Sequence, residues 1–147
     1  MYLDREGNPV DCPDDVAGLH IQSRSGQIFK VKLPSNSCAF QIGEAAQISS
    51  GGLLQATPHA VLAPKAAVAP GTTRETLAVF IEPEFHVPLE IPKGKSVNDC
   101  QVAGATLPPT VLPLRARWKP GYTFGDFHHA TVKAFCVEDE KTPKDQS

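Results

Sequence analysis

Hydrophobic and polar positions alternate most clearly near the start of the chain. Two segments, 18–23 and 27–33, repeat with the two-residue period that is typical of β-strands. Only Arg24-Ser25-Gly26 separates them, so the pattern predicts a β-hairpin. Further apolar segments predict short strands at 38–42, 45–48, 53–62 and 77–81, the last of them buried. Residues 1–15 are rich in turn formers and are expected to form a loop that connects strands.

Glycines and prolines divide these segments. Ser49-Ser50-Gly51-Gly52 predicts a tight turn with positive φ angles. Pro58 lies within the predicted strand 53–62, and its missing N–H restricts it to an edge or a bulge. Many short strands interrupted in this way predict a sandwich or a jelly roll rather than a parallel α/β sheet.

The last third of the chain has a different pattern. From residue 83 to 120 the sequence is rich in proline and predicts extended loop, packed onto the core by Trp118. Thr123-Phe124-Gly125-Asp126 then matches the pattern of a capped helix start. Phe124, Phe127 and Thr131 follow at helical spacing, so a C-terminal helix is expected before a disordered tail.

Composition and charge restrict the partners. The chain has 147 residues, 41% of them hydrophobic and 20% charged, with a net charge of −2, so we expect no nucleic-acid partner. No apolar run approaches the roughly 20 residues of a membrane span, and residues 1–15 do not resemble a signal peptide. Four widely spaced cysteines, Cys12, Cys38, Cys100 and Cys136, favour free thiols, with Cys38 in the core. These features predict a cytoplasmic protein without a membrane partner.

One histidine and one arginine stand out as candidates for chemistry. An Ile-Gly-Glu segment at 42–44 and the serine-glycine turn at 49–52 precede His59, and Arg74-Glu75-Thr76 and Phe80-x-x-Pro83 follow it. This order resembles the 2-oxoglutarate and iron(II)-dependent dioxygenases of the isopenicillin N synthase-like branch. By residue type alone, a strand histidine is more often structural than a ligand, and the arginine could be a solvated one at the start of a strand.

The resemblance implies a fold, two cofactors and three site residues. The fold would be a double-stranded β-helix, a jelly roll, that oxidises a small organic substrate. His59 would be an Fe(II) ligand, while Arg74 and Thr76 would hold the distal carboxylate of 2-oxoglutarate through charge-assisted hydrogen bonds. Residues 114–127 also resemble the C-terminal segment of some plant and fungal members.

The chain also departs from the family pattern. The His-x-Asp motif with the first two iron ligands and an upstream Asn-x-Tyr segment do not occur, Ala60 replaces an arginine, and residues 64–70 lengthen a loop. Asp126 and His128 cannot replace the missing ligands, because residues two apart on a helix do not share a face. His128 and His129 are expected on a solvated helix surface.

We therefore expect an all-β, partial jelly roll with a C-terminal helix. Residues 1–91 would be the C-terminal part of the jelly-roll core, 92–122 the proline-rich segment, 123–138 the helix and 139–147 the tail. The chain alone would be inactive as an oxygenase. The alternatives are a non-catalytic truncated relative that self-associates through open strand edges, and a metal-free module that binds small carboxylates.

Overall fold

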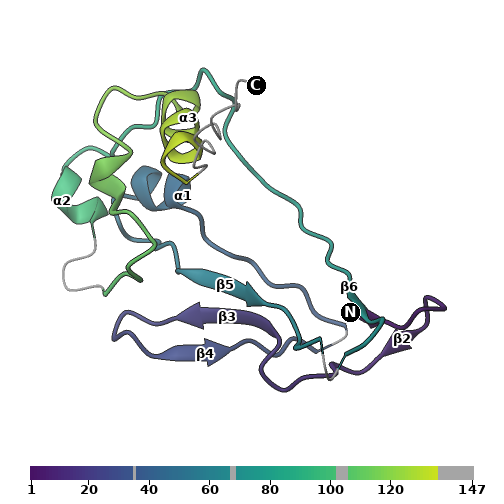
Figure 1. Ribbon diagram of the computed structural model, residues 1–147. Helices are drawn as coiled ribbons and strands as arrows, with labels where there is room; N and C mark the ends of the chain where they lie inside the picture. Colours follow the sequence, from purple (N-terminus) through teal and green to yellow (C-terminus); the bar gives the residue numbers. More distant parts are fainter. Residues whose placement is uncertain (35, 67–68, 102–105, 136–147) are drawn as a thin grey trace, which may run out of the picture.

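The computed structural model describes residues 1–34, 36–66, 69–101 and 106–135. Within them, strands and helices occupy different regions, with the helices gathered on one side and the strands in two small sheets (Figure 1). The elements in chain order are β1 Tyr2–Leu3, β2 Pro9–Val10, β3 Gly18–Gln22, β4 Ile28–Lys30, α1 Glu44–Ser49, β5 His59–Leu62, β6 Thr73–Arg74, α2 Val97–Cys100, the 3-10 helix η1 Leu114–Ala116, and α3 Phe124–Phe135. We call α1, together with the described residues from 85 to the end of α3, the helical half.

The predicted hairpin is confirmed. β3 and β4 are antiparallel, with Ile21 opposite Phe29, and Gly26 supplies a φ of 84° in the connecting turn. β5 pairs with the other edge of β3 and gives the sheet order β4-β3-β5, so Pro58 lies just before an edge strand, where its missing N–H breaks no ladder.

The expectation of a loop for residues 1–15 is wrong in part, because β1 and β2 form a second hairpin there. The Asp4 carboxylate holds the turn by accepting hydrogen bonds from Asn8 and from the Glu6 N–H, and these bonds lower the pKa of Asp4. β6 joins β1 on its other side, which makes the sheet order β2-β1-β6.

The hydrophobic core lies in the helical half. Trp118 is 3% exposed, as expected of an anchor for the proline-rich segment. The segment before α3 is fixed by main-chain bonds from Leu89 to Tyr122 and from Phe124 to Val87. The core cluster consists of Ile48, Leu89, Cys100, Leu114, Trp118, Phe124 and Phe127.

The predicted strand 45–48 is wrong, because this segment forms α1. The alanines of α1 are strong helix formers, and two glycines end the helix with the positive φ angles predicted for this turn. The Gly51 N–H bonds to the Ile48 carbonyl and the Gly52 N–H to that of Gln47. A Cβ at Gly52 would also collide with the Asp99 carbonyl of α2.

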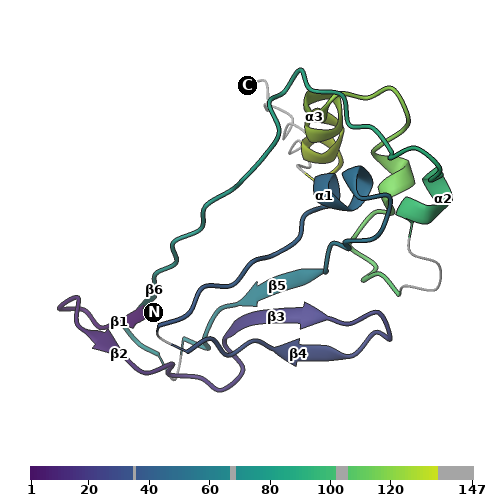
Figure 2. The ribbon, with the colours of Figure 1, turned by 180° about the vertical axis from the view of Figure 1, so that it is seen from behind.

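Three other strand predictions need correction. Residues 38–42 are extended but unpaired, and Cys38 is exposed rather than in the core. The strand predicted at 53–62 is limited to β5. Residues 77–81 are neither a strand nor buried: they pair with no other described strand as they cross from β6 toward α3 (Figures 1 and 2), and their side chains stay exposed.

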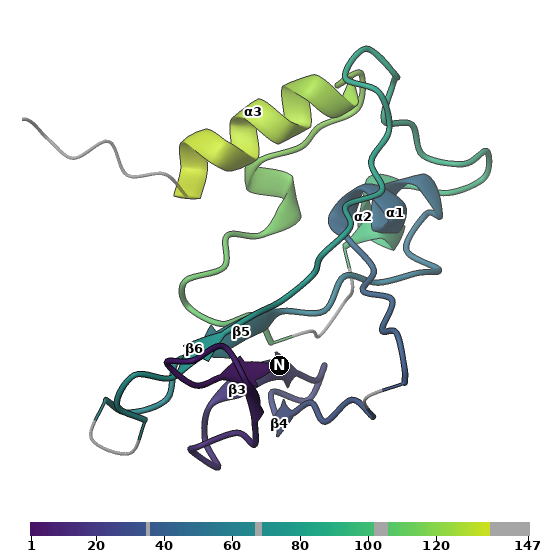
Figure 3. The same ribbon diagram turned by 90° about the vertical axis from the view of Figure 1, so that its right-hand side faces the viewer.

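The fold is therefore mixed rather than all-β. The antiparallel sheets and the C-terminal helix agree with the sequence, but the described strands form two three-stranded sheets that do not close into a barrel (Figure 3). α3 begins one residue after Thr123 as its capping pattern predicts, and residues 136–147, including the expected tail, lie outside the described part. No helix among the described residues is long and apolar enough to cross a membrane. Cys12, Cys38 and Cys100 are free thiols.

Candidate functional site

A cleft of about 1080 Å³ lies between the β3–β5 sheet and the helical half. Its walls come from β3, the β3–β4 turn, the segments on both sides of α1, η1 and α3. The Gln22 amide donates a 3.0 Å hydrogen bond to the Thr106 carbonyl and so connects the sheet to the opposite wall. The apolar lining residues are Ile21, Ile42, Leu53, Leu54, Phe80, Leu107, Val111, Leu114 and Phe135.

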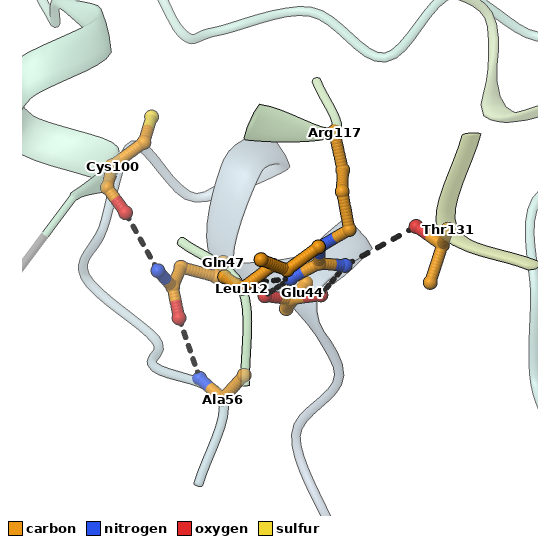
Figure 4. A network of polar contacts seen from close by, with 7 residues as sticks. All are labelled: Glu44, Gln47, Ala56, Cys100, Leu112, Arg117 and Thr131. Atoms are coloured by element: carbon orange, nitrogen blue, oxygen red, sulfur yellow. Dashed lines mark hydrogen bonds and ion pairs between the residues drawn. The ribbon is translucent and has the colours of Figure 1, made fainter. Parts of the chain in front are cut away.

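A buried ion pair supports the helical wall of the cleft. The Arg117 guanidinium donates two hydrogen bonds to the Glu44 carboxylate, of 2.6 and 2.7 Å, and further bonds to the Leu112 carbonyl and the Thr131 hydroxyl (Figure 4). The side chain of Arg117 is 2% exposed and that of Glu44 is 28% exposed. Phe135 lies under the guanidinium, 5.2 Å from its carbon to the ring centre.

Gln47 holds the neighbouring part of the wall. Its amide nitrogen donates a 2.6 Å bond to the Cys100 carbonyl, and its amide oxygen accepts a 2.7 Å bond from the Ala56 N–H (Figure 4). The residue therefore connects α1, α2 and the segment that leads to β5. Since both ends of a buried amide are satisfied, this wall is fixed in one arrangement.

The charge of the lining is positive. Three arginines line the cleft, Arg24, Arg115 and Arg117, whereas Glu44 is the one acidic residue in the lining. Arg117 is paired with Glu44, while Arg24 and Arg115 are exposed and form no ion pair with another described residue. Two free guanidinium groups beside apolar side chains suit an organic anion, because they can bind a carboxylate with two parallel hydrogen bonds.

His59, the predicted metal ligand, lines this cleft from the start of β5. The ring is exposed, and its Nε2 lies 3.1 Å from the Gln41 side-chain nitrogen. Its Nδ1 lies 3.2 Å from the Thr57 carbonyl, a distance at which an Nδ1–H would donate a hydrogen bond. A histidine in this position can form hydrogen bonds with a bound molecule.

Arg74 and Thr76, predicted to bind 2-oxoglutarate, are not among the residues that line the cleft. Arg74 ends β6 opposite Tyr2, and both Arg74 and Thr76 are exposed. The structure thus places Arg74 on the other sheet and Thr76 in the unpaired segment that follows it, and does not bring either residue together with His59 around one cavity.

The described residues do not fit an iron(II) centre. Iron(II) oxygenases need two histidines and a carboxylate on one face, and no three histidine, cysteine, aspartate or glutamate side chains of the described ranges group together. Of the other histidines, His128 is half-buried 5.1 Å from the Phe85 ring centre, and His129 is exposed as predicted.

Sequence reasoning assigned no role to Arg24, Arg115, Arg117 or Gln47. The ion-pair partners Arg117 and Glu44 are 73 positions apart, so no local pattern connects them. Arg115 and Arg117 form an Arg-x-Arg sequence beside Trp118, and this cationic pair next to a core aromatic is a signal that could have identified the wall.

Comparisons of this chain with models of protein families, with curated proteins and with solved structures give no match.

Proposed function

We propose that this chain binds a small organic carboxylate in the cleft between the β3–β5 sheet and the helical half. One observation carries the proposal: the cleft lining holds three arginines against one acidic residue, and that acidic residue is already paired with Arg117. Arg24 and Arg115 are therefore available for an anion. A metal-free module that binds carboxylates requires no metal ligands. An oxygenase requires three, and the described residues do not group them together.

Size and polarity support the same class of ligand. Small-molecule sites have volumes of roughly 300–1,000 Å³ and a mostly apolar lining with a few polar groups. The cleft, of about 1080 Å³, is slightly larger than this range, and Leu53, Leu107 and Phe135 supply apolar surface for the hydrocarbon part of a ligand. We place the protein in the cytoplasm, which the free thiols of its described cysteines support.

Calorimetric titration of the full chain with 2-oxoglutarate, a dicarboxylate of the proposed class, tests this function. We expect binding that Arg24→Gln and Arg115→Gln each weaken about tenfold or more, because a hydrogen bond to a charged group contributes about 1.5–3 kcal/mol. Arg74→Gln is the matched control, since Arg74 is an exposed arginine outside the cleft.

Two results would overturn the proposal. Wild-type chain that binds neither 2-oxoglutarate nor a more apolar carboxylate, such as 4-phenylbutyrate, has no carboxylate site. Binding that is lost in Arg74→Gln but retained in Arg24→Gln and Arg115→Gln would move the site to the residues that the family resemblance suggests.

A second candidate is the oxygenase activity that the resemblance implies, with Fe(II), 2-oxoglutarate and a jelly roll. The observation that favours it is the position of His59 in the lining of the cleft. It requires two further metal ligands, which the described ranges do not group with His59. Repeating the titration with Co(II), a spectroscopic substitute for Fe(II), separates the candidates: this one requires metal binding that His59→Ala abolishes, and a metal-free module requires none.

A further inference from the structure

The longest unpaired apolar stretch of the described chain follows β6. We call residues Glu75–Glu84 the strap. Its apolar centre is almost fully open to solvent, with Leu77 92%, Val79 78%, Phe80 82% and Ile81 88% exposed. Monomeric soluble proteins rarely expose contiguous apolar surface of this kind without a partner.

The main chain of the strap is also unpaired. β1 hydrogen-bonds to β6 as far as Glu75, which exchanges bonds of 2.9 and 3.1 Å with Met1. From Thr76 to Glu82, no N–H or C=O bonds to another described residue. The strap therefore extends an edge strand of the β2-β1-β6 sheet as an open, β-branched template for pairing.

We infer that this template binds a second copy of the chain, with the two straps paired as antiparallel strands about a two-fold axis at Val79. In this register Leu77 faces Ile81 of the other copy, Ala78 faces Phe80, and Val79 faces itself. All five apolar residues of the centre then pair with each other, and cross-strand apolar pairs are what stabilise a sheet.

Opposite charges meet at both ends of the paired segment in this register. Arg74 faces Glu84 of the other copy twice, once on each side of the axis. Arg74 forms no ion pair with a described residue, and the Glu84 carboxylate forms an ion pair only with His86 among the described residues, exposed and at 3.5 Å. Both groups are thus free to form ion pairs between copies.

Neighbouring registers are less favourable. A shift by one position places Glu75 opposite Glu82, and like charges directly opposite each other are destabilising. A shift by two centres the pair on Ala78. Arg74 then faces Glu82, but Ile81 faces Glu75 and Phe80 faces Thr76, so two residues of the apolar centre lose their apolar partners. In the Val79 register Glu75 faces Pro83, outside that centre. The self-complementarity of the sequence about Val79 is the reason to choose a second copy, rather than an unrelated strand, as the partner.

Disulfide trapping tests the register. The reference chain carries Cys12→Ser, Cys38→Ser and Cys136→Ser and keeps Cys100, which is buried. We expect Val79→Cys to form a covalent dimer in oxidised glutathione about tenfold or more faster than Val132→Cys, an exposed position on α3, because pairing raises the local thiol concentration. Ala78→Cys should be as slow as Val132→Cys, since its partner in this register is Phe80.

Light scattering after size exclusion tests the dimer without any added cysteine. The wild-type chain should have twice the monomer mass, and Val79→Lys should have the mass of a monomer, because two lysines would face each other at the axis. Val79 is exposed in one copy, so this substitution removes no internal packing.

Three results would overturn the inference. If the wild-type chain is monomeric at all concentrations and Val79→Cys forms the disulfide no faster than Val132→Cys, two straps do not pair with each other. A broad distribution of large assemblies would show unspecific edge aggregation. Faster trapping of Ala78→Cys than of Val79→Cys would contradict the register.

Discussion

Arg117 makes four side-chain hydrogen bonds, which fix one wall of the cleft. Its guanidinium binds the Glu44 carboxylate, the Leu112 carbonyl and the Thr131 hydroxyl, and so joins α1 to α3 and to the segment before η1. Only its Nε lacks a partner among the described residues. A buried cation is costly unless it is paired, so the position of Glu44 decides whether this wall is stable.

Glu44→Gln should lower the free energy of unfolding by about 2–3 kcal/mol, somewhat less than the 3–5 kcal/mol typical of a broken buried pair, because Glu44 is 28% exposed. The double variant Glu44→Gln/Arg117→Met should recover part of this loss, since it leaves no unpaired charge. Urea denaturation of the two variants and of the Arg117→Met single variant measures the coupling. His86→Gln, which breaks the exposed pair with Glu84 and lies outside the segment 75–84, is the control and should change stability by less than about 0.5 kcal/mol. Equal losses in the Glu44 and His86 variants would show that the buried pair is not stabilising.

Two helices have capping boxes, and only that of α3 was predicted. The expectation of extended loop for residues 83–120 is wrong at α2 and η1, which form short helices there. Ser96 and Asp99 form a capping box at α2, and Thr123 and Asp126 form the same arrangement at α3. At α3 the Thr123 N–H and hydroxyl each donate a 2.9 Å bond to the Asp126 carboxylate. These bonds favour the charged carboxylate and hold the pKa of Asp126 below the usual value of 3.8.

The lowered pKa of Asp126 makes the stability of α3 depend on pH. Because the folded pKa is below the unfolded value of 3.8, the stabilising effect is fully present above pH 3.8 and is lost as the pH falls through the folded pKa. A carboxyl NMR titration should show this pKa returning toward 3.8 in Thr123→Ala, with a loss of about 1 kcal/mol of stability at neutral pH. Asp4, whose pKa is lowered by other groups, is the internal control and should not change. An Asp126 pKa that is the same in both proteins would contradict the capping geometry.

The whole molecule consists of a packed helical half and two sheets that bury little. The core cluster belongs entirely to the helical half, whereas every residue of β5 is exposed and every residue of β3 is only partly buried. Stability should therefore differ between the two regions, because local opening is easiest where few apolar contacts are lost.

Hydrogen exchange should show this difference directly. We expect the slowest-exchanging amides in α1 and α3 and faster exchange in β3–β5. Trp118→Ala should cost about 3–5 kcal/mol and reduce the protection of α1 and α3 together, since both pack on one cluster. Val132→Ala, on the exposed side of α3, is the matched control. Amides of β3 that are better protected than those of α3 would refute this division.

Local sequence patterns correctly predicted the features whose causes are local. The β3–β4 hairpin follows from alternation around a three-residue turn, and the start of α3 follows from the capping residues. The glycine turn at 51–52 was also predicted, although it ends a helix instead of joining two strands. At 45–48 the alanines and the glycine cap outweigh an apolar run that is too short to distinguish helix from strand.

The candidate site could not be read from the sequence in the same way. His59 was selected as a site residue and does line the cleft, and its role as a metal ligand stays a prediction. Arg74 lies on the other sheet, and Thr76 lies in the unpaired segment after it. Arg24 and Arg115 can be identified as candidate anion-binding residues only from the cleft, because its lining is assembled from residues between Ile21 and Phe135. Long-range pairs such as Glu44 with Arg117 have no local signal.

The sequence by itself determined the hairpin, the caps of the last helix, the anchoring role of Trp118 and the self-complementary charges around Val79, because each depends on neighbouring residues or on one residue type. The tertiary structure alone decided which polar groups meet, which apolar segments are covered and where the cleft lies. Burial and ion pairing depend on contacts between distant segments, and residues 77–81 show the difference: their composition predicts a buried strand, yet no described strand pairs with them and their side chains stay exposed.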